Sequence, residues 1–570
     1  MSLPSKREKS GLPPEPPLRE PKPLLIFAVV FLISFILFGI LSVSTGRDNN
    51  WDLRNYHYYN PYAFLHGRLG FDYAPAQLQS FLNPTQDLLF YSLVTHLKPV
   101  WAGFFMGAIH GLGFAFIFAI AFHLLSAKTF PLRVGLSLLC AAVGVYGAVF
   151  LCELGASEND LLTSLFVLAS LLILIRRMTQ HDTLTGGGGF LSLILAGIIL
   201  GFAVGMKLTV IIYAVGTAVA LFFVERQWKN RFLVTGLWGL AFIVGFAISA
   251  GHWMATLWSA YGNPLFPFYN HIFQSPYFEL MELSDKRYLP QSLLQGLLYP
   301  FHFLSRTHFT YLSYDFRDAR YAVIYVLAVL YLLSILLRRV LTPKAGKRSK
   351  KKEAQSPKKR VQLSGSEKFL LLFFLSSYIV WQVQFSIIRY LAPLEALAPL
   401  IIVILAMHIF PASKLQSLSS GAALTIASAV LIIAAIVKPV YHERLPWSAT
   451  FFEVEAPRLE DPNHTLVVIA HDRPWAYLIP SFQPGVRFVS VRNNLTAPNR
   501  PTQLQSELRA LLQGHQGPMY LLSRREYLRE DADEILKFYE LSLKSSEGQS
   551  VRSKHERDGL FLWPVIRSQR

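Results

Sequence analysis

The chain has 570 residues, of which 52% are hydrophobic, and its formal net charge is +18. This hydrophobic share excludes an ordinary soluble globule and indicates a polytopic membrane protein. Two cysteines, Cys140 and Cys152, exclude a disulfide framework, and the basic residues gather in short segments between apolar runs, which argues against nucleic acid as the partner.

Eleven apolar segments are predicted to span the membrane as helices. In chain order they are 23–45, 100–126, 131–152, 160–177, 189–206, 207–224, 232–252, 319–339, 367–388, 391–410 and 420–438. The apolar segment 86–97 is interpreted as a helix on the outer surface, because crossing a bilayer takes about 20 residues. The predicted fold is therefore an all-α polytopic bundle of about 11 transmembrane helices within residues 23–440.

Lysine and arginine residues gather in alternate loops, which the positive-inside rule places on the cytoplasmic side. They are dense in the tail 1–22 and in the loop 340–366. This predicts a cytoplasmic N-terminus and puts the first loop, 46–99, and the loop 253–318 outside, in a protein of the plasma (inner) membrane. If 86–97 crossed the membrane, the sidedness of every later loop would reverse.

Residues 441–570 differ in composition, with more charged residues, Pro and Asn. Apolar runs predict strands at Thr465–Ala470, Arg487–Val491 and Met519–Leu522, and helices are predicted at Thr502–Gln513 and Arg524–Tyr539. Strands that alternate with helices indicate a small α/β domain. The count of spans before it predicts that this C-terminal domain is extracytoplasmic.

Acidic residues lie at predicted outer ends of spans. Asp48 and Asp52 follow the first span, and Glu158 and Asp160 lie at the outer end of the fourth. Tyr56 lies four residues after Asp52, so a helical turn there would place both on one face. A carboxylate can take a proton from a hydroxyl or an amine. The alternatives are that the loop acids only keep the loop hydrated and that Asp160 is a capping residue.

Basic residues lie on the same predicted side. Lys207 joins two apolar helices, and Arg389-Tyr390 follows another span. Lys207 alone also fits a side chain that extends to the interface, whereas a charge between closely connected spans often marks a substrate path. A guanidinium binds two phosphate oxygens. An acid in the first outer loop and a late Arg therefore meet the needs of a sugar transfer from polyprenyl phosphate.

The arrangement of Asp52 and Tyr56, followed by Gly67 and by Asn83-Pro84, resembles the first outer loop of GT-C glycosyltransferases. This superfamily includes protein O-mannosyltransferases and aminoarabinose transferases. Three later elements of the superfamily also have counterparts. Asn159-Asp160 is similar to its second acidic site, and Gly205-Met206-Lys207 is similar to its lysine-bearing turn. Arg389-Tyr390 with Pro393 is similar to its late Arg-Tyr-Pro element.

The resemblance implies an inverting membrane glycosyltransferase that moves a sugar from a polyprenyl-phosphate donor to an extracytoplasmic lipid, glycan or protein. It implies that Asp52, ahead of Asp48, is the base. The substrate-binding residues would be Tyr56, Glu158, Asp160, Lys207, Arg389 and Tyr390. The residue after Asp52 is Leu53, where the family often has Glu, and a divalent metal stays open, as do the sugar and the acceptor. Two other classes also stay open: a transporter or flippase of lipid-linked saccharides, and a non-catalytic membrane scaffold.

Overall fold

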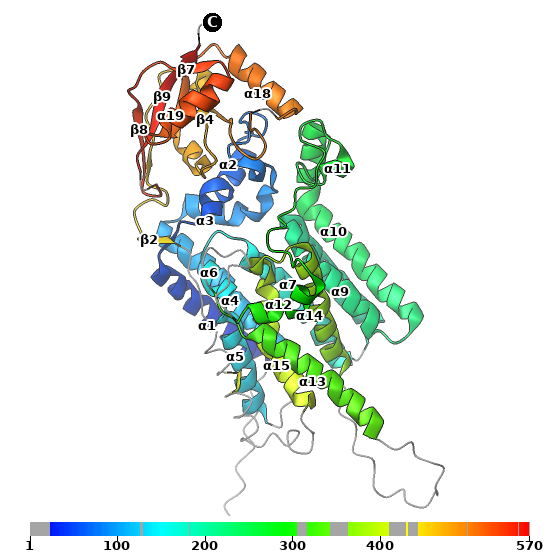
Figure 1. The fold of residues 1–570 in the computed structure, drawn as a ribbon. Coiled ribbons are helices and arrows are strands. Elements are labelled where there is room, and N and C mark those ends of the chain that lie inside the picture. Colours follow the sequence, from blue (N-terminus) through cyan, green and yellow to red (C-terminus); the bar gives the residue numbers. More distant parts are fainter. Residues whose placement is uncertain are drawn as a thin grey trace, which may run out of the picture.

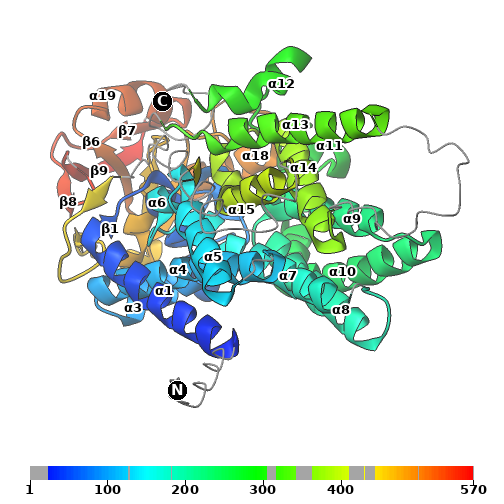
Figure 2. The ribbon, with the colours of Figure 1, turned by 90° about the horizontal axis from the view of Figure 1, so that it is seen from below.

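The computed structural model describes residues 23–125, 129–181, 183–304, 316–341, 363–409, 429–430, 443–498, 500–556 and 558–568. Long helices form the lower part of the molecule in Figure 1, and the C-terminal sheet domain, in orange and red, lies at its upper end. Short helices of the first loop, in blue, lie between them. Seen from below in Figure 2, α15 (Ala392–Ile409) lies among the other helices of the bundle.

Seven helices of the described residues are long and apolar enough to cross a membrane. They are α1 (Pro23–Thr45), α4 (Pro99–Leu124), α7 (Asp160–His181), α8 (Gly187–Met206), α10 (Trp228–Tyr261), α13 (Arg320–Leu341) and α15. Three more pack with them, α5 (Phe130–Val145), α9 (Ile211–Val224) and α14 (Gly365–Gln384). A helical membrane bundle is thus confirmed, whereas the count of about 11 spans is not. The predicted span 420–438 lies outside the described residues, apart from 429–430.

The predicted span 131–152 is not one helix but two, α5 and α6 (Ala148–Glu153). The break lies at Gly147, whose backbone is extended. Glu395 of α15 accepts hydrogen bonds from the backbone N–H groups of Val149 (3.2 Å) and Phe150 (3.1 Å). A Cβ at Gly147 would lie 1.9 Å from Oε1 of Glu395. The break therefore depends on a carboxylate from a distant helix, which the apolar pattern of the span does not reveal.

A row of glycines lets α8 and α10 approach closely. Gly197, Gly201 and Gly205 recur at every fourth residue of α8, and a Cβ at Gly201 would lie 2.0 Å from the backbone oxygen of Phe242 in α10. Small residues at this spacing allow two membrane helices to pack backbone to backbone. Lys207 directly follows Met206, the last residue of α8. The close packing of α8 on α10 therefore also fixes the position of Lys207.

The loop after α1 folds into short helices. They are the π-helical turn η1 (Leu53–His57), α2 (Tyr59–Leu65), the short helices η2 (Gln77–Phe81) and η3 (Pro84–Gln86), and α3 (Leu88–His96). With nine residues, α3 is about 14 Å long, which is less than half of a hydrocarbon core of about 30 Å. A helix of this length agrees with the prediction that 86–97 does not cross the membrane.

The C-terminal domain is built on a seven-stranded mixed sheet in the order β3-β8-β9-β6-β4-β5, with β7 paired to β9. The strands are β3 (Val454–Glu455), β4 (Leu466–Ile469), β5 (Arg487–Ser490), β6 (Met519–Arg524), β7 (Leu541–Leu543), β8 (Gln549–Ser553) and β9 (Leu560–Arg567). The three predicted strands are β4, β5 and β6, which are parallel. The helix α18 (Gln503–Gly514) follows β5, and a C-terminal α/β domain is confirmed.

The predicted helix Arg524–Tyr539 is wrong in its first part. Arg524 ends β6, where it is paired with Leu560 of β9, so the ladder holds it in an extended conformation. Helical structure begins at α19 (Leu528–Glu530) and continues in the π-helical turn η8 (Asp531–Leu536).

The first loop and the C-terminal domain pack into one unit, an arrangement not predicted from the sequence. Tyr73 pairs with β5: its N–H donates to Phe488 O and its O accepts from Ser490 N, both at 2.9 Å. The buried guanidinium of Arg68 donates to Asp72 and, at 2.6 Å, to the backbone oxygen of Val486. In addition, β1 (Arg47–Asp48) pairs with β2 (Arg444–Leu445). The domain therefore covers the loop that carries Asp52.

A fully buried ion-pair network connects α13 with α15. Nη2 of Arg320 contacts Asp318 (2.5 Å) and Glu395 (3.5 Å), and Nη1 donates to the backbone oxygen of Val143 (3.0 Å). All three charged side chains are at most 1% exposed. The network fixes α15 relative to the break between α5 and α6.

Arg320→Met is expected to destabilise the protein by about 3–5 kcal/mol, because two buried carboxylates lose their cation. Thermal unfolding of the purified protein in detergent measures the loss. Arg287→Met, in an exposed pair with Asp285, is the matched control and should leave the melting temperature nearly unchanged. Equal melting temperatures for the two variants would contradict a structural role of the network.

Candidate functional site

Arg389 joins two carboxylates at the end of the bundle that faces the C-terminal domain. Its Nη1 lies 2.9 Å from Oδ2 of Asp52 and 3.7 Å from Oε1 of Glu158. The three side chains are 12%, 15% and 2% exposed, respectively. Asp52 directly precedes η1, Glu158 lies two residues before the start of α7, and Arg389 lies in the short helix η5 (Ile388–Leu391). Three distant segments thus converge on one buried cluster.

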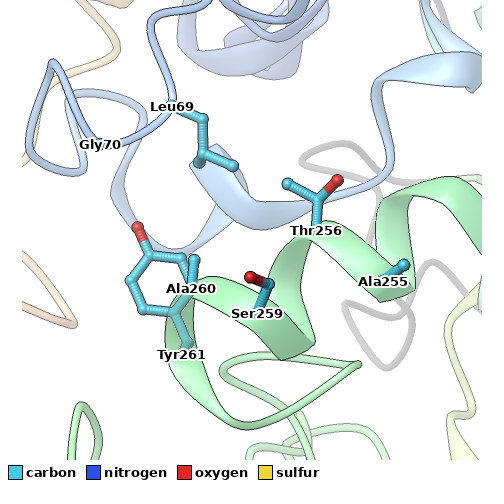
Figure 3. A pocket seen from close by; sticks show the side chains of 7 residues that line it. All are labelled: Leu69, Gly70, Ala255, Thr256, Ser259, Ala260 and Tyr261. Atoms are coloured by element: carbon cyan, nitrogen blue, oxygen red, sulfur yellow. The ribbon is translucent and has the colours of Figure 1, made fainter.

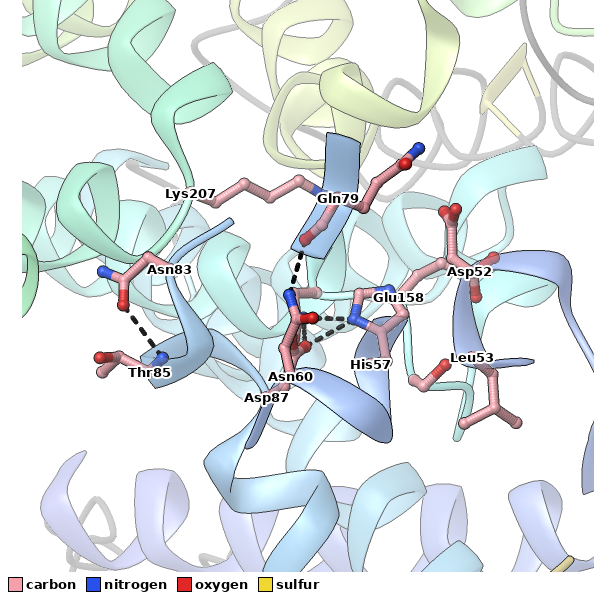
Figure 4. Close-up of polar contacts among 12 residues, drawn as sticks. Asp52, Leu53, His57, Asn60, Gln79, Asn83, Thr85, Asp87, Glu158 and Lys207 are labelled. Atoms are coloured by element: carbon pink, nitrogen blue, oxygen red, sulfur yellow. Dashed lines mark hydrogen bonds and ion pairs between the residues drawn. The ribbon is translucent and has the colours of Figure 1, made fainter. Parts of the chain in front are cut away.

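Lys207 forms a second ion pair in the same cluster. Its Nζ lies 2.6 Å from Oδ1 of Asp160 and 5.5 Å from the centre of the Tyr390 ring, a distance at which a cation is attracted by an aromatic face. Figure 4 shows Lys207 and Asp52 extending from opposite sides, with Glu158 and His57 between them. The side chain of Lys207 therefore points into the protein and not along the interface.

Asp48 holds the loop against the start of α7. Its Oδ2 accepts hydrogen bonds from the backbone N–H of Ser157 (2.8 Å) and from Nδ2 of Asn50 (2.8 Å). The same amide nitrogen lies 3.0 Å from Oε2 of Glu158. Because these donors already occupy the carboxylate of Asp48, its contacts fit a positioning residue better than a base.

His57 and Asp87 form a buried pair that was not predicted from the sequence. Nδ1 of His57 lies 2.5 Å from Oδ1 of Asp87, and Asn159 donates Nδ2 to the same oxygen at 2.6 Å. The rings of Tyr56 and His57 are in contact, with centroids 4.1 Å apart. His57 is the last residue of the π-helical turn η1, and π-helical turns occur often at functional sites, but this turn is not apparent from the sequence.

The environment of the cluster shifts the pKa values of Asp52, His57 and Asp87, and burial raises the pKa of Asp87. Burial raises the pKa of Asp52, but the positive charge of Arg389, joined by that of His57 whenever the imidazole is protonated, outweighs burial and holds this pKa below its usual range. Burial lowers the pKa of His57, but the carboxylate of Asp87, together with Asp52 and Glu158, raises it above the usual value. Asp52 is therefore ionised, and His57 holds a proton more firmly than a free histidine.

The space beside the cluster is narrow. A cavity of about 10 Å³, lined by Asp160, Tyr213, Arg389 and Tyr390 among others, has room for about one water molecule. Arg389 and Lys207 are already paired with Asp52 and Asp160, so any further anion would have to displace carboxylate oxygens from these cations. A larger cavity of about 510 Å³ lies between the first loop and the end of α10 (Figure 3), where Leu69, Thr256 and Tyr261 line it.

No group of three or more His, Cys, Asp or Glu side chains in the described part of the chain has the arrangement of a metal site. The carboxylates of the cluster face cations of the protein instead, Asp52 facing Arg389 and Asp160 facing Lys207.

Comparison of the chain with protein-family models, with curated proteins and with solved structures found no match.

Proposed function

We propose that this protein is an integral membrane glycosyltransferase, which moves a sugar from a polyprenyl-phosphate donor to an extracytoplasmic acceptor. The observation that supports this most is the guanidinium of Arg389, held between Asp52 and Glu158 near Lys207. Such a cluster offers cations for a phosphate and a carboxylate for a proton. The resemblance of the same residues to GT-C enzymes points in the same direction.

In the proposed donor complex, the phosphate takes the place of carboxylate oxygens on Arg389 and Lys207. A guanidinium can bind two phosphate oxygens, and the ammonium adds a point charge. Glu158 and Asp160, released from these cations, would accept hydrogen bonds from sugar hydroxyl groups. The ring of Tyr390, already beside Lys207, would pack on the sugar or the first lipid unit.

In the proposed reaction, a hydroxyl or amine of the acceptor attacks the anomeric carbon on the side opposite the phosphate. The bond between this carbon and the phosphate oxygen breaks, and its electron pair stays on the oxygen, where Arg389 balances the charge. Asp52 takes the acceptor's proton. Paired with Arg389, Asp52 is a weak base, because its pKa is held low. Binding of the phosphate to Arg389 would free the carboxylate and make it more basic.

The proposed orientation is an inside N-terminus, an inside loop at 341–366 and an outside C-terminal domain, which follows from the positive-inside rule. Most of this loop, including Ser349, lies outside the described residues. Cysteines introduced at Ser349 and at the exposed Gly514 should react with an impermeant reagent from opposite faces. The native Cys140 and Cys152 are buried, so the protein without introduced cysteines should not react and is the control. Labelling of both positions from one face would contradict this orientation.

A deletion strain tests the function in cells. Without the protein, one polyprenyl-phosphate sugar should accumulate and one class of envelope glycan, lipid or glycoprotein should lose that sugar, as seen by mass spectrometry. The native chain should restore both, and Asp52→Asn should restore neither. Full restoration by Asp52→Asn would favour a transporter or a scaffold instead.

A further inference from the structure

We infer that the pair of His57 and Asp87 is where the acceptor's proton comes to rest after the sugar transfer. The inference rests on the proposed function, because His57 would receive the proton that Asp52 has taken from the acceptor. His57 thereby becomes a second proton acceptor of the reaction.

The geometry leaves one atom of the imidazole available. An ionised carboxylate only accepts hydrogen bonds, so Nδ1 of His57 carries the hydrogen that binds Asp87, and Nε2 of the neutral ring keeps its lone pair. His57 is 1% exposed and Asp87 is fully buried. Nε2 has no hydrogen-bond partner among the described residues. Because Nδ1 already holds a hydrogen, Nε2 is the one ring atom at which the imidazole can bind a further proton.

The charges around His57 favour its protonated form. Asp52 acts on it from the residue before η1, Asp87 from the segment between η3 and α3, and Glu158 from the segment before α7. The opposing positive charges are the guanidinium of Arg389, which is paired with Asp52, and the ammonium of Lys207, which acts on both Asp52 and Asp87. In Figure 4 the imidazole lies between Asp87 on one side and Asp52 and Glu158 on the other. A carboxylate on each side stabilises an imidazolium.

The proposed step follows the transfer. In the proposed donor complex Asp52 is no longer held by Arg389 and can turn toward Nε2, which has no partner in the resting structure. Its O–H bond then breaks, the proton binds the lone pair of Nε2, and Asp52 becomes a carboxylate again. The new imidazolium is paired with the carboxylate of Asp87 and later gives its proton to water. Asp52 can then pair with Arg389 once the polyprenyl phosphate leaves, which restores the resting cluster.

The same arrangement predicts proton uptake when a phosphate binds, without any sugar or acceptor. A phosphate on Arg389 adds negative charge near His57 and removes the cation from Asp52, and both changes raise the proton affinity of the imidazole. Farnesyl phosphate is the probe. At pH 8 it is almost fully a dianion, because its second pKa is about 6, so a proton taken up must bind the protein.

Isothermal titration of the purified protein with farnesyl phosphate, in buffers of different ionisation enthalpy, measures this uptake. The native protein is expected to take up as much as about one proton per bound probe. His57→Asn should bind the probe with little or no uptake. Asp87→Asn keeps the imidazole but lowers its pKa, so its half-maximal uptake should move to lower pH. His464→Asn removes a histidine of an exposed pair with Asp461 and should behave like the native chain.

Each outcome decides between the two proposals. Probe binding without proton uptake, or uptake unchanged in His57→Asn, overturns the role of His57 and leaves the phosphate site standing. No binding of the probe to the native protein contradicts the phosphate site itself, and the role of His57 with it. If His57→Asn does not fold, Asp87→Asn provides the test. If the pH of its half-maximal proton uptake equals that of the native protein, the inference is wrong.

Discussion

Asp52→Asn is expected to lower the turnover of sugar transfer by about 10²–10⁴-fold, the usual contribution of a general base. Asparagine has nearly the same size and still offers an oxygen to Arg389, which lies 2.9 Å from the carboxylate, but it cannot accept a full proton. Donor binding should therefore be largely retained. Release of free polyprenyl phosphate at saturating donor measures turnover, and donor titration measures binding.

Asp48→Asn is the matched control for this prediction. Asp48 lies four residues earlier in the same loop and is also buried, but its oxygens are bound by Ser157 and Asn50. The variant should lose less turnover than Asp52→Asn and show its main effect as a lower melting temperature. If Asp48→Asn were inactive and Asp52→Asn active, the base would be assigned to the wrong carboxylate.

Arg389→Lys is expected to weaken donor binding about 10- to 100-fold, because a charge-assisted hydrogen bond contributes about 1.5–3 kcal/mol. Lysine keeps the charge but loses the fork that holds two phosphate oxygens. Since the side chain is only 12% exposed and paired with Asp52, the ammonium still has a carboxylate beside it and the protein should still fold. Donor titration of the purified variant gives the change in binding.

Arg500→Lys controls for the general effect of replacing an arginine in an ion pair. Arg500 pairs with Glu279 at 2.6 Å, outside the cluster of Arg389, and its replacement should leave donor binding unchanged. A purely structural Arg389 would reveal itself in a different way: the Arg389→Lys protein would express poorly, and the surviving fraction would bind the donor with native affinity.

The helical bundle follows from the sequence because long apolar runs leave the chain few other ways to satisfy its backbone in a membrane. The first span matches α1 at both ends. The break at Gly147 was missed, because its cause is the carboxylate of Glu395, almost 250 residues away. The strand β8 was missed for a different reason, since Gln549–Ser553 contains a single apolar residue, Val551.

The sequence alone predicted most of the acidic and basic residues that form the candidate site. The predicted acids and bases lie in one cluster, which connects Asp52 to Arg389 and Asp160 to Lys207. The role of each residue depends on its contacts in the folded protein, and the spacing of residues along the chain does not reveal these contacts. Asp48 and Asp52 both follow the first span, and the sequence does not reveal that Asp48 is bound by the backbone of Ser157. His57 was missed because Asp87 reaches it only once the first loop is folded.

The most direct test of the proposed function uses the purified protein in lipid nanodiscs, with lipid-linked sugars extracted from the membranes of cells that lack it. Mass spectrometry follows the conversion of polyprenyl-phosphate sugar to free polyprenyl phosphate, with the sugar appearing on a co-extracted acceptor. The native protein should carry out this conversion, and Asp52→Asn should leave the donor intact although it still binds it. Release of polyprenyl phosphate at equal rates by both proteins, or by neither, would contradict a glycosyltransferase that works through Asp52.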